Sequence, residues 1–192
     1  MDPTIRIADA STDAAGIAAV YAPHVERHFT SFELAAPDAA TMAQRVEQTL
    51  ARFPWLVAAQ GTEVLGYAYA ASHRERQAYQ WCTDIAVYLR DDAQRRGLGR
   101  KLYGALFELL RRQGYVNAYA GIALPNPASV ALHEALGFGL IGVYRETGYK
   151  HGAWRDVGWW QCRLQALPTK PVPPTPFAVL RGDGRTRDLV EG

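Results

Sequence analysis

The sequence predicts one α/β domain built around a mixed β-sheet. Its 192 residues, 48% of them hydrophobic, suffice for a single domain with a sizeable core but not for two. Two strand-like stretches flank a short turn, which indicates an antiparallel hairpin. Later strand-like stretches are separated by helical ones, which indicates crossover connections. A sheet that combines a hairpin with crossovers is mixed.

The first part of the chain predicts a strand followed by two helices. Ser11 or Thr12 is the expected cap of the first helix, and its helical spacing is interrupted at Pro23. Pro37 and Asp38 stand where the second helix should begin. The predicted strand covers residues 4–11, and the two helices cover residues 13–29 and 37–53.

The rest of the predicted domain contains six strands and two helices. Gly61 and Thr62 form the hairpin turn, and the third of these strands is rich in β-forming residues. One helix follows a turn with two glycines, and the other is closed by Gly137. The strands cover residues 55–60, 63–72, 80–90, 117–123, 139–148 and 154–167, and the helices lie within residues 91–115 and 126–136.

The end of the chain differs in composition from the remainder. It is rich in proline and glycine and has no hydrophobic periodicity. We therefore predict a domain over residues 1–166 and a Pro/Gly-rich tail, residues 167–192, outside the core.

Charge and cysteine content exclude several classes of protein. A net charge of +2 gives no reason to expect nucleic-acid binding. Cys82 and Cys162 are too few for a disulfide framework and lack metal-ligand spacing, so reduced thiols and no metal site are expected. No apolar run approaches the roughly 18 residues of a membrane span, and the N-terminus lacks a signal-peptide core. These features predict a cytoplasmic domain that does not bind a membrane.

A turn with two glycines among basic side chains precedes the third predicted helix. The first amides of a helix lack intrahelical partners, and the helix dipole adds positive charge at the same end. Gly97 and Gly99 would let the backbone approach a phosphate, and Arg95, Arg96 and Arg100 would add charge. The alternative is an ordinary loop with solvated arginines.

Two motifs in this part of the chain resemble those of the GCN5-related N-acetyltransferases (GNAT). The segment QRRGLGRKLY fits the Q/R-x-x-G-x-G/A signature of that superfamily, in which the loop and helix hold the pyrophosphate of acetyl-coenzyme A. The resemblance covers roughly residues 4–166 and implies the GNAT acyl-CoA N-acyltransferase fold, a mixed, mostly antiparallel central sheet flanked by helices. The second motif, N-x-x-[AS]-x-x-[LF]-[YH]-x-x-x-GF, is matched by Asn126, Ser129, Leu132, Gly137 and Phe138.

Within the superfamily the chain looks like the enzymes that acetylate phosphinothricin and methionine sulfoximine. The resemblance implies acetyl-CoA as cosubstrate, a small amino-acid-like acceptor, direct transfer in a ternary complex, and a homodimer, for which Trp159 and Trp160 are candidate contacts. The matching stretches are FPWLVA, AYQWCTDIAVYL, LPNPASVALHEALGFGLIG and GYKHGAWRDVGWWQ.

The resemblance also implies which residues hold the coenzyme. Backbone amides of one strand would pair with the pantetheine arm and polarise the thioester, and the glycine turn would hold the pyrophosphate. Asn126 would bond the pantetheine arm, with a plain helix cap as its alternative. The implied set is Ile85, Ala86, Val87, Tyr88, Gln94, Arg95, Arg96, Gly97, Leu98, Gly99, Arg100, Asn126 and Ser129.

Two residues are candidates for proton transfer. Asp84 occupies the position of the usual family glutamate and is expected to act as base, directly or through water, or to orient substrate while another group takes the proton. His133 is expected to protonate the departing thiolate or to position substrate. Each has a structural alternative: a solvent-facing aspartate and an incidental helical histidine.

An amino-acid substrate would need a cationic and aromatic pocket. Arg74 and Arg76 would suit a carboxylate or phosphinate, although arginines are common in surface loops. Tyr79, Tyr88 and Phe32 are the expected pocket walls, with core packing as the alternative for the last two.

Two other functions remain open from the sequence. One is transfer to a different amine, such as another amino acid or a protein N-terminus. The other is a non-catalytic acyl-CoA sensor on the same fold, because Asp84 departs from the usual glutamate.

Overall fold

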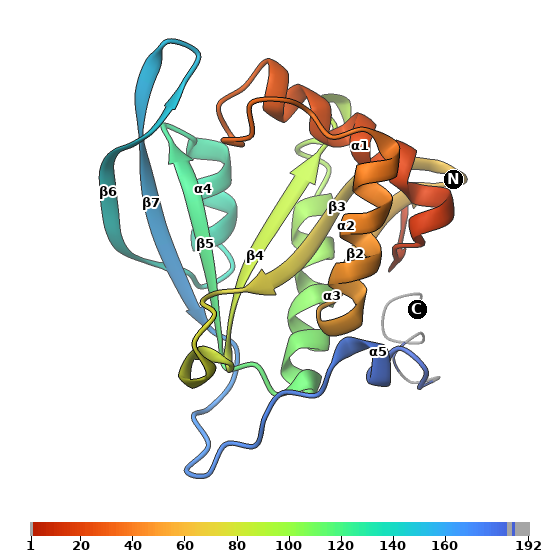
Figure 1. Cartoon of the computed structure of the whole chain (residues 1–192), viewed down its shortest axis with the longest axis vertical. Helices are drawn as coiled ribbons and strands as arrows, with labels where there is room; N and C mark the ends of the chain where they lie inside the picture. Colours follow the sequence, from red (N-terminus) through yellow and green to blue (C-terminus); the bar gives the residue numbers. More distant parts are fainter. Residues whose placement is uncertain (1, 184–185, 187–192) are drawn as a thin grey trace.

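Seven strands form one continuous sheet in the computed structural model of the chain, which describes residues 2–183 and 186 (Figure 1). The strand order is β1-β2-β3-β4-β5-β7-β6, and within the described residues β4 and β5 form the one parallel pair. The predicted mixed, mostly antiparallel sheet is thus confirmed. The strands are β1 (Thr4–Ile7), β2 (Trp55–Gln60), β3 (Glu63–Ser72), β4 (Cys82–Leu89), β5 (Asn117–Leu124), β6 (Gly139–Lys150) and β7 (Ala153–Arg163).

Helices cover both faces of the sheet. In the view of Figure 1, α1 and α2 lie in front of the sheet and α3 lies behind it. Helix α4 joins the α3 side, where Tyr103 and His133 are hydrogen-bonded. None of the described helices is both long and apolar enough to cross a membrane. The helices are α1 (Ala10–Glu26), α2 (Ala39–Arg52), α3 (Leu98–Gln113), α4 (Pro127–Glu134) and α5 (Phe177–Leu180), with short 3-10 turns η1 (Gln77–Tyr79) and η2 (Asp91–Ala93).

The parallel pair β4–β5 is short, and this opens the sheet. Its register has three partners, the last of which is Asp84 opposite Tyr119. Beyond that pair the two strands diverge into a V (Figure 1). The backbone groups that face each other across the V have no ladder partner there, so they are available to a ligand.

The start of α1 differs from the prediction in two ways. Asp9, not Ser11 or Thr12, is the N-cap, and its side chain accepts a hydrogen bond from the Ser11 amide at 2.8 Å. The helix also continues past Pro23 to Glu26. A proline this near the C-terminal end removes only one helical hydrogen bond, so the last turn survives. The predicted start of α2 is confirmed, since Asp38 caps it.

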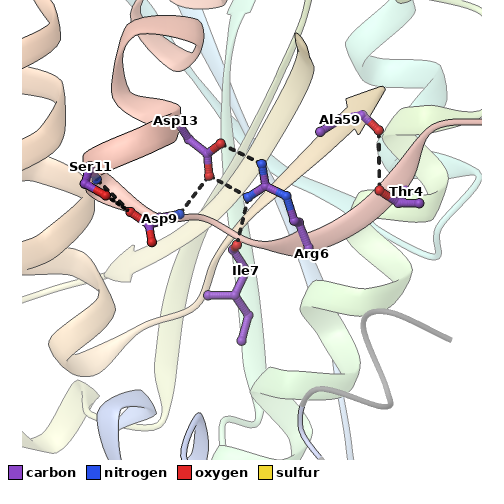
Figure 2. Close-up of polar contacts among 7 residues, drawn as sticks. All are labelled: Thr4, Arg6, Ile7, Asp9, Ser11, Asp13 and Ala59. Carbon is purple, nitrogen blue, oxygen red and sulfur yellow. Dashed lines mark hydrogen bonds and ion pairs between the residues drawn. The ribbon is translucent and has the colours of Figure 1, made fainter. Parts of the chain in front are cut away.

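A buried ion pair ties β1 to α1 (Figure 2). The guanidinium of Arg6 donates to both carboxylate oxygens of Asp13, at 2.6 and 2.7 Å. Asp13 also accepts from the backbone amide of Asp9 at 2.7 Å. Because Asp13 is almost completely buried, removing Arg6 would leave an uncompensated carboxylate in the core.

The segment predicted to be a tail outside the core returns to the domain, so that prediction is wrong for its described part. Phe177 of α5 is fully buried in the hydrophobic core. The Thr175 amide donates to the Gln113 carbonyl at 2.8 Å, and the Trp81 indole donates to the Val172 carbonyl at 2.7 Å. The prolines remove backbone donors, but the buried Phe177 ring and these hydrogen bonds hold the segment against the domain. Residues 184–185 and 187–192 of the predicted tail lie outside the described residues.

Candidate active site

A cavity of about 600 Å³ occupies the V between β4 and β5. It extends from the β4 backbone to the first turn of α3 and to α4. Arg96 of the predicted coenzyme site is exposed and does not line it. The cavity brings together the other predicted coenzyme-site residues and one predicted catalytic residue: Ile85, Ala86, Val87, Tyr88, Gln94, Arg95, Gly97, Leu98, Gly99, Arg100, Asn126, Ser129 and His133.

The N-terminus of α3 provides an anion site at one end of the cavity. Gly97, its N-cap, has φ +79° and no neighbouring atom within 4 Å of the place a Cβ would take. Arg95 also has a positive φ, 58°, so the turn is tightly curled. Gly97 has no side chain to cap the helix, so the first-turn amides remain available. The side chains of Arg95 and Arg100 add positive charge to a corner that suits a diphosphate.

Gly99 lines the cavity and also has a packing role. A Cβ at this position would lie 3.0 Å from Cδ2 of Leu132, in α4. The glycine therefore lets α3 and α4 pack closely, and the packing positions the α3 N-terminus beside the cavity. Of the two glycines, Gly97 is the one with a positive φ, a conformation that glycine adopts more readily than other residues.

The α4 residues of the motif form a hydrogen-bonded unit on the cavity wall. Asn126 is the N-cap, and its Oδ1 accepts from the Ser129 amide at 3.1 Å. This use of the oxygen agrees with the capping alternative, and it leaves the amide NH₂ of Asn126 for a ligand. Nδ1 of His133 is 2.8 Å from the Ser129 carbonyl, and Nε2 is 3.1 Å from the Tyr103 hydroxyl.

These contacts define the protonation of His133. A carbonyl can only accept, so Nδ1 carries the proton, and Nε2 accepts from the hydroxyl of Tyr103. Burial lowers the pKa of His133 and raises that of Tyr103, so both are neutral at physiological pH. Both residues line the cavity, and together they form a proton-carrying pair.

On the opposite side of the V, Asp84 forms an unexpected pair with His73. The Nδ1–H of His73 donates to Oδ1 of Asp84 at 2.6 Å. The carboxylate side chain is 31% exposed and the imidazole 11%. Burial raises the pKa of Asp84, and the hydrogen bond from His73 opposes that rise. The sequence left open that Asp84 merely faces solvent. Its hydrogen bond to His73 and its partial burial do not fit that alternative.

Aromatic side chains surround this pair. The His73 ring stacks on Tyr119 of β5, with ring centroids 4.1 Å apart and planes 13° from parallel. Tyr79 and Trp159 meet the same ring edge-on, at 6.3 and 6.1 Å. The predicted pocket residue Tyr79 thus lies next to His73, in a region built from four separate segments.

Of the remaining predicted substrate residues, two are arginines of one loop and two are aromatic. The Arg74 guanidinium lies 5.8 Å from the Trp159 ring and close to His73, whereas Arg76 is exposed at the start of η1 with no side-chain cap bond. The ring of Phe32 packs over Gly148, where a Cβ would be 2.3 Å away. Tyr88 lines the cavity, but its ring packs edge-on against Tyr21 at 4.9 Å, in agreement with the core-packing alternative.

The sequence interpretation missed two residues of this region and misplaced a third. His73 had a usable signal, because it directly follows a strand that pairs antiparallel with β4. Tyr103 follows Gly99 by one helical turn and so faces the same cavity. The suggestion that Trp159 and Trp160 form a dimer contact is not supported, because Trp160 is buried in the core and Trp159 faces His73. Alternation along β7 places them on opposite faces.

Comparison with known proteins gives a consistent result. The Acetyltransferase (GNAT) domain family matches residues 5–159. A phosphinothricin N-acetyltransferase of Streptomyces viridochromogenes is 39% identical over 172 residues, 90% of this chain and 93% of that protein. An L-methionine sulfoximine/L-methionine sulfone acetyltransferase of Pseudomonas aeruginosa is 38% identical over 122 residues, 63% of this chain and 70% of that protein. The crystal structure of a GNAT superfamily phosphinothricin acetyltransferase from Sinorhizobium meliloti, in complex with AcCoA, superposes with a TM-score of 0.83 at 33% identity, covering 92% of this chain and 99% of that one.

Proposed function

The chain belongs to the GNAT acetyltransferase family, and we propose that it transfers an acetyl group from acetyl-CoA to the amino group of a small amino-acid-like substrate. The observation that carries this proposal is the V between β4 and β5. One side of the V leads to the anion site of α3, and the other side carries a carboxylate and a guanidinium. A thioester and an amine could therefore meet between the two strands.

The coenzyme side of the V fits acetyl-CoA, which supplies the acetyl group as a thioester. The first-turn amides of α3, with Arg95 and Arg100, would hold the diphosphate. The unpaired backbone groups of β4 after Asp84 would pair with the amides of the pantetheine arm, and one of them would polarise the thioester carbonyl. The free NH₂ of Asn126 would donate to the same arm.

Two proton transfers accompany amide formation, and each side of the V can support one. An α-ammonium is mostly protonated at neutral pH and must lose a proton before it attacks. Asp84 supplies the negative charge that draws this proton away. The Tyr103 hydroxyl, which its hydrogen bond to Nε2 of His133 holds at the cavity wall, supplies a proton to the departing thiolate and regains one from water.

The best-supported acceptors are phosphinothricin and methionine sulfoximine. The relatives named above act on them, and both compounds carry an α-amino acid group with a second polar head. Arg74 would bind a carboxylate or phosphinate beside Asp84, which would bring the neighbouring amine to the V. Arg76, Tyr79 and Phe32 would complete the rim of that pocket.

A thiol-release assay with acetyl-CoA tests the function directly. L-Phosphinothricin, L-methionine sulfoximine, a panel of plain amino acids and a peptide with a free N-terminus would be compared with wild type, Asp84→Asn and Glu47→Gln. Glu47 is exposed on α2, so its variant is a matched loss of one carboxylate far from the V. Turnover of the first two substrates that falls only in Asp84→Asn supports the proposal. Turnover of the plain amino acids or the peptide alone would replace the acceptor, and coenzyme binding without turnover on any amine would favour a sensor.

The proposal extends to the assembly and the location of the protein. A homodimer is expected from the resemblance, and exposed apolar side chains on the edge strand β6, Leu140, Ile141 and Tyr144, support a contact at this edge rather than at Trp159 and Trp160. Light scattering at micromolar concentration would test it. We retain the cytoplasm as the expected location.

A further inference from the structure

The side chain of His73 has an unused nitrogen next to the proposed reaction site. Its Nδ1–H donates to Asp84, and its Nε2 has no hydrogen-bond partner among the described residues. We propose that His73 is the immediate proton acceptor of the reaction, with Nε2 receiving the proton of the substrate ammonium while Asp84 holds the ring. The inference rests on the proposed acetyl transfer and names the group that completes it.

The position of His73 matches this role. Asp84 and Tyr119 are the last register partners before β4 and β5 diverge, and the imidazole bonds to one and stacks on the other. The ring therefore lies over the apex of the V. An amine that attacks a thioester held between the strands would have to pass this point.

The surroundings fix the orientation of the ring. Stacking on Tyr119 fixes its plane, and the bond to Asp84 fixes its rotation within that plane. Tyr79 and Trp159 close two further edges. A base held in this way loses little freedom when the substrate arrives, as a positioned catalytic group requires.

An imidazole is also better matched to the task than a carboxylate. A base works best when its proton affinity is close to that set by the working pH, and imidazole satisfies this at neutral pH whereas a carboxylate is much weaker. A carboxylate that accepts the Nδ1–H holds the imidazole in the tautomer with a free Nε2 and stabilises the imidazolium that forms. Asp84 is in position to do both.

The other titratable groups around His73 allow it to act in this way. Burial raises the pKa of Tyr119, so its phenol is uncharged at neutral pH. Tyr79 contributes only a ring edge. The Arg74 guanidinium donates to the backbone carbonyl of His73 at 2.8 Å and lies over the Trp159 ring. Asp84 is thus the anion bonded directly to the imidazole.

The proton balance is closed. One N–H bond of the substrate ammonium breaks, its electron pair stays on nitrogen, and the proton forms an N–H bond at Nε2 of His73. The amine nitrogen then bonds to the acetyl carbon, and the C–S bond breaks with its electron pair on sulfur. The second proton of the nitrogen passes to water, sulfur takes the hydroxyl proton of Tyr103, and the Tyr103 oxygen takes a proton back from water. His73 returns its proton to water after the products leave.

The kinetic test compares His73→Phe with Asp84→Asn in the full chain. Phenylalanine keeps the stack on Tyr119 but has no nitrogen. We expect kcat to fall on the order of 10²- to 10⁴-fold with the acetyl-CoA KM unchanged, as for loss of a general base. The remaining rate should rise with pH as the fraction of neutral substrate amine rises. His73→Ala should regain activity with added imidazole. If His73→Phe keeps kcat within about threefold of wild type while Asp84→Asn does not, Asp84 acts directly and the proposal is wrong.

A second measurement does not depend on turnover. Nitrogen-15 NMR of wild type labelled at histidine should show His73 as the Nδ1–H tautomer at neutral pH, and Asp84→Asn should shift it toward a mixture. An Nε2–H tautomer in the wild type would overturn the proposal even if the enzyme is active. If wild type turns over none of the amines, the acetyl-transfer proposal fails, and the tautomer still decides whether His73 can accept a proton at Nε2.

Discussion

The two sides of the V offer different kinds of groups to their proposed ligands. The coenzyme side consists mainly of backbone amides of β4 and α3, with Arg95 and Arg100 beside them. The acceptor side consists of side chains, among them His73 and Asp84 in direct contact. Backbone amides can hold a diphosphate whatever the side chains are, whereas an acceptor is recognised only by the side chains that meet it.

This difference implies that the choice of amine can change while the use of acetyl-CoA stays the same. Changes on the acceptor side alter which amine is bound, while the coenzyme side and the fold are unaffected. Changes at the coenzyme side alter the use of acetyl-CoA for every amine. The two sides should therefore be separable by mutation.

The largest separation is expected between two arginines. Arg74→Ala should raise the KM for the amino-acid substrate about 10- to 100-fold, as for loss of a hydrogen bond to a charged group, and leave the acetyl-CoA KM unchanged. Arg95→Ala should raise the acetyl-CoA KM and leave the KM for the amino-acid substrate unchanged. The effect should be smaller, because backbone amides of α3 would also bind the diphosphate. Steady-state kinetics with each substrate varied in turn measures both. If each variant changed both constants alike, the two sides would not be independent.

A single glycine should affect only the coenzyme side. Gly97→Ala places a Cβ at φ +79°, which costs about 1–2 kcal/mol for an L-residue. The turn should relax away from this conformation and misalign the first-turn amides of α3, which raises the acetyl-CoA Kd about tenfold. Calorimetric titration with coenzyme A measures it. Gly104→Ala, inside the same helix with no atom within 4 Å of the added carbon, is the control and should bind normally.

The coenzyme side was the part that the sequence could predict. Its residues are close together in the chain, in one strand, one turn and two helix starts, so a spacing pattern contains most of the geometry. Arg96 and Gly99 mark the limit of that pattern. One points to solvent, and the other serves the packing of α3 on α4, and both depend on contacts that spacing does not contain.

The acceptor side was predicted only in part, because the segments that meet there are separate in the sequence. His73 follows β3 and Asp84 lies in β4, and only the register between these strands brings them together. The aromatic residues Tyr119 and Trp159 come from two further strands. For the C-terminal segment, composition indicated a tail, but Phe177 is enough to dock it on the core. Composition reports average character and misses a single anchoring side chain.

The hydroxyl of Tyr103 should affect the chemical step but not binding. Tyr103→Phe keeps the ring stacked on Phe107 and removes the hydrogen bond to Nε2 of His133. We expect kcat to fall about fivefold to tenfold, the cost of a hydrogen bond, with the coenzyme Kd unchanged. Stopped-flow measurement of thiol release separates the chemical step from product release. An unchanged rate would show that sulfur receives its proton from water.

The smallest effect concerns stability, and it comes from the buried histidine of the coenzyme side. Burial lowers the pKa of His133, so the folded protein binds that proton less readily than the unfolded chain does. The unfolded state then takes up more protons as the pH falls below about 6.5, and the stability contributed by neutral His133 is present above that pH and lost below it. The pKa of His24 is lowered in the same way, and this adds to the loss of stability.

Between pH 7.5 and 5.5 the free energy of unfolding in urea should fall on the order of 1 kcal/mol because of His133. His133→Gln should flatten the pH dependence, whereas His28→Gln, at an exposed position, should keep it. Equal slopes in His133→Gln and wild type would mean that His133 is already protonated in the folded protein, which the hydrogen bond from Tyr103 to its Nε2 does not permit.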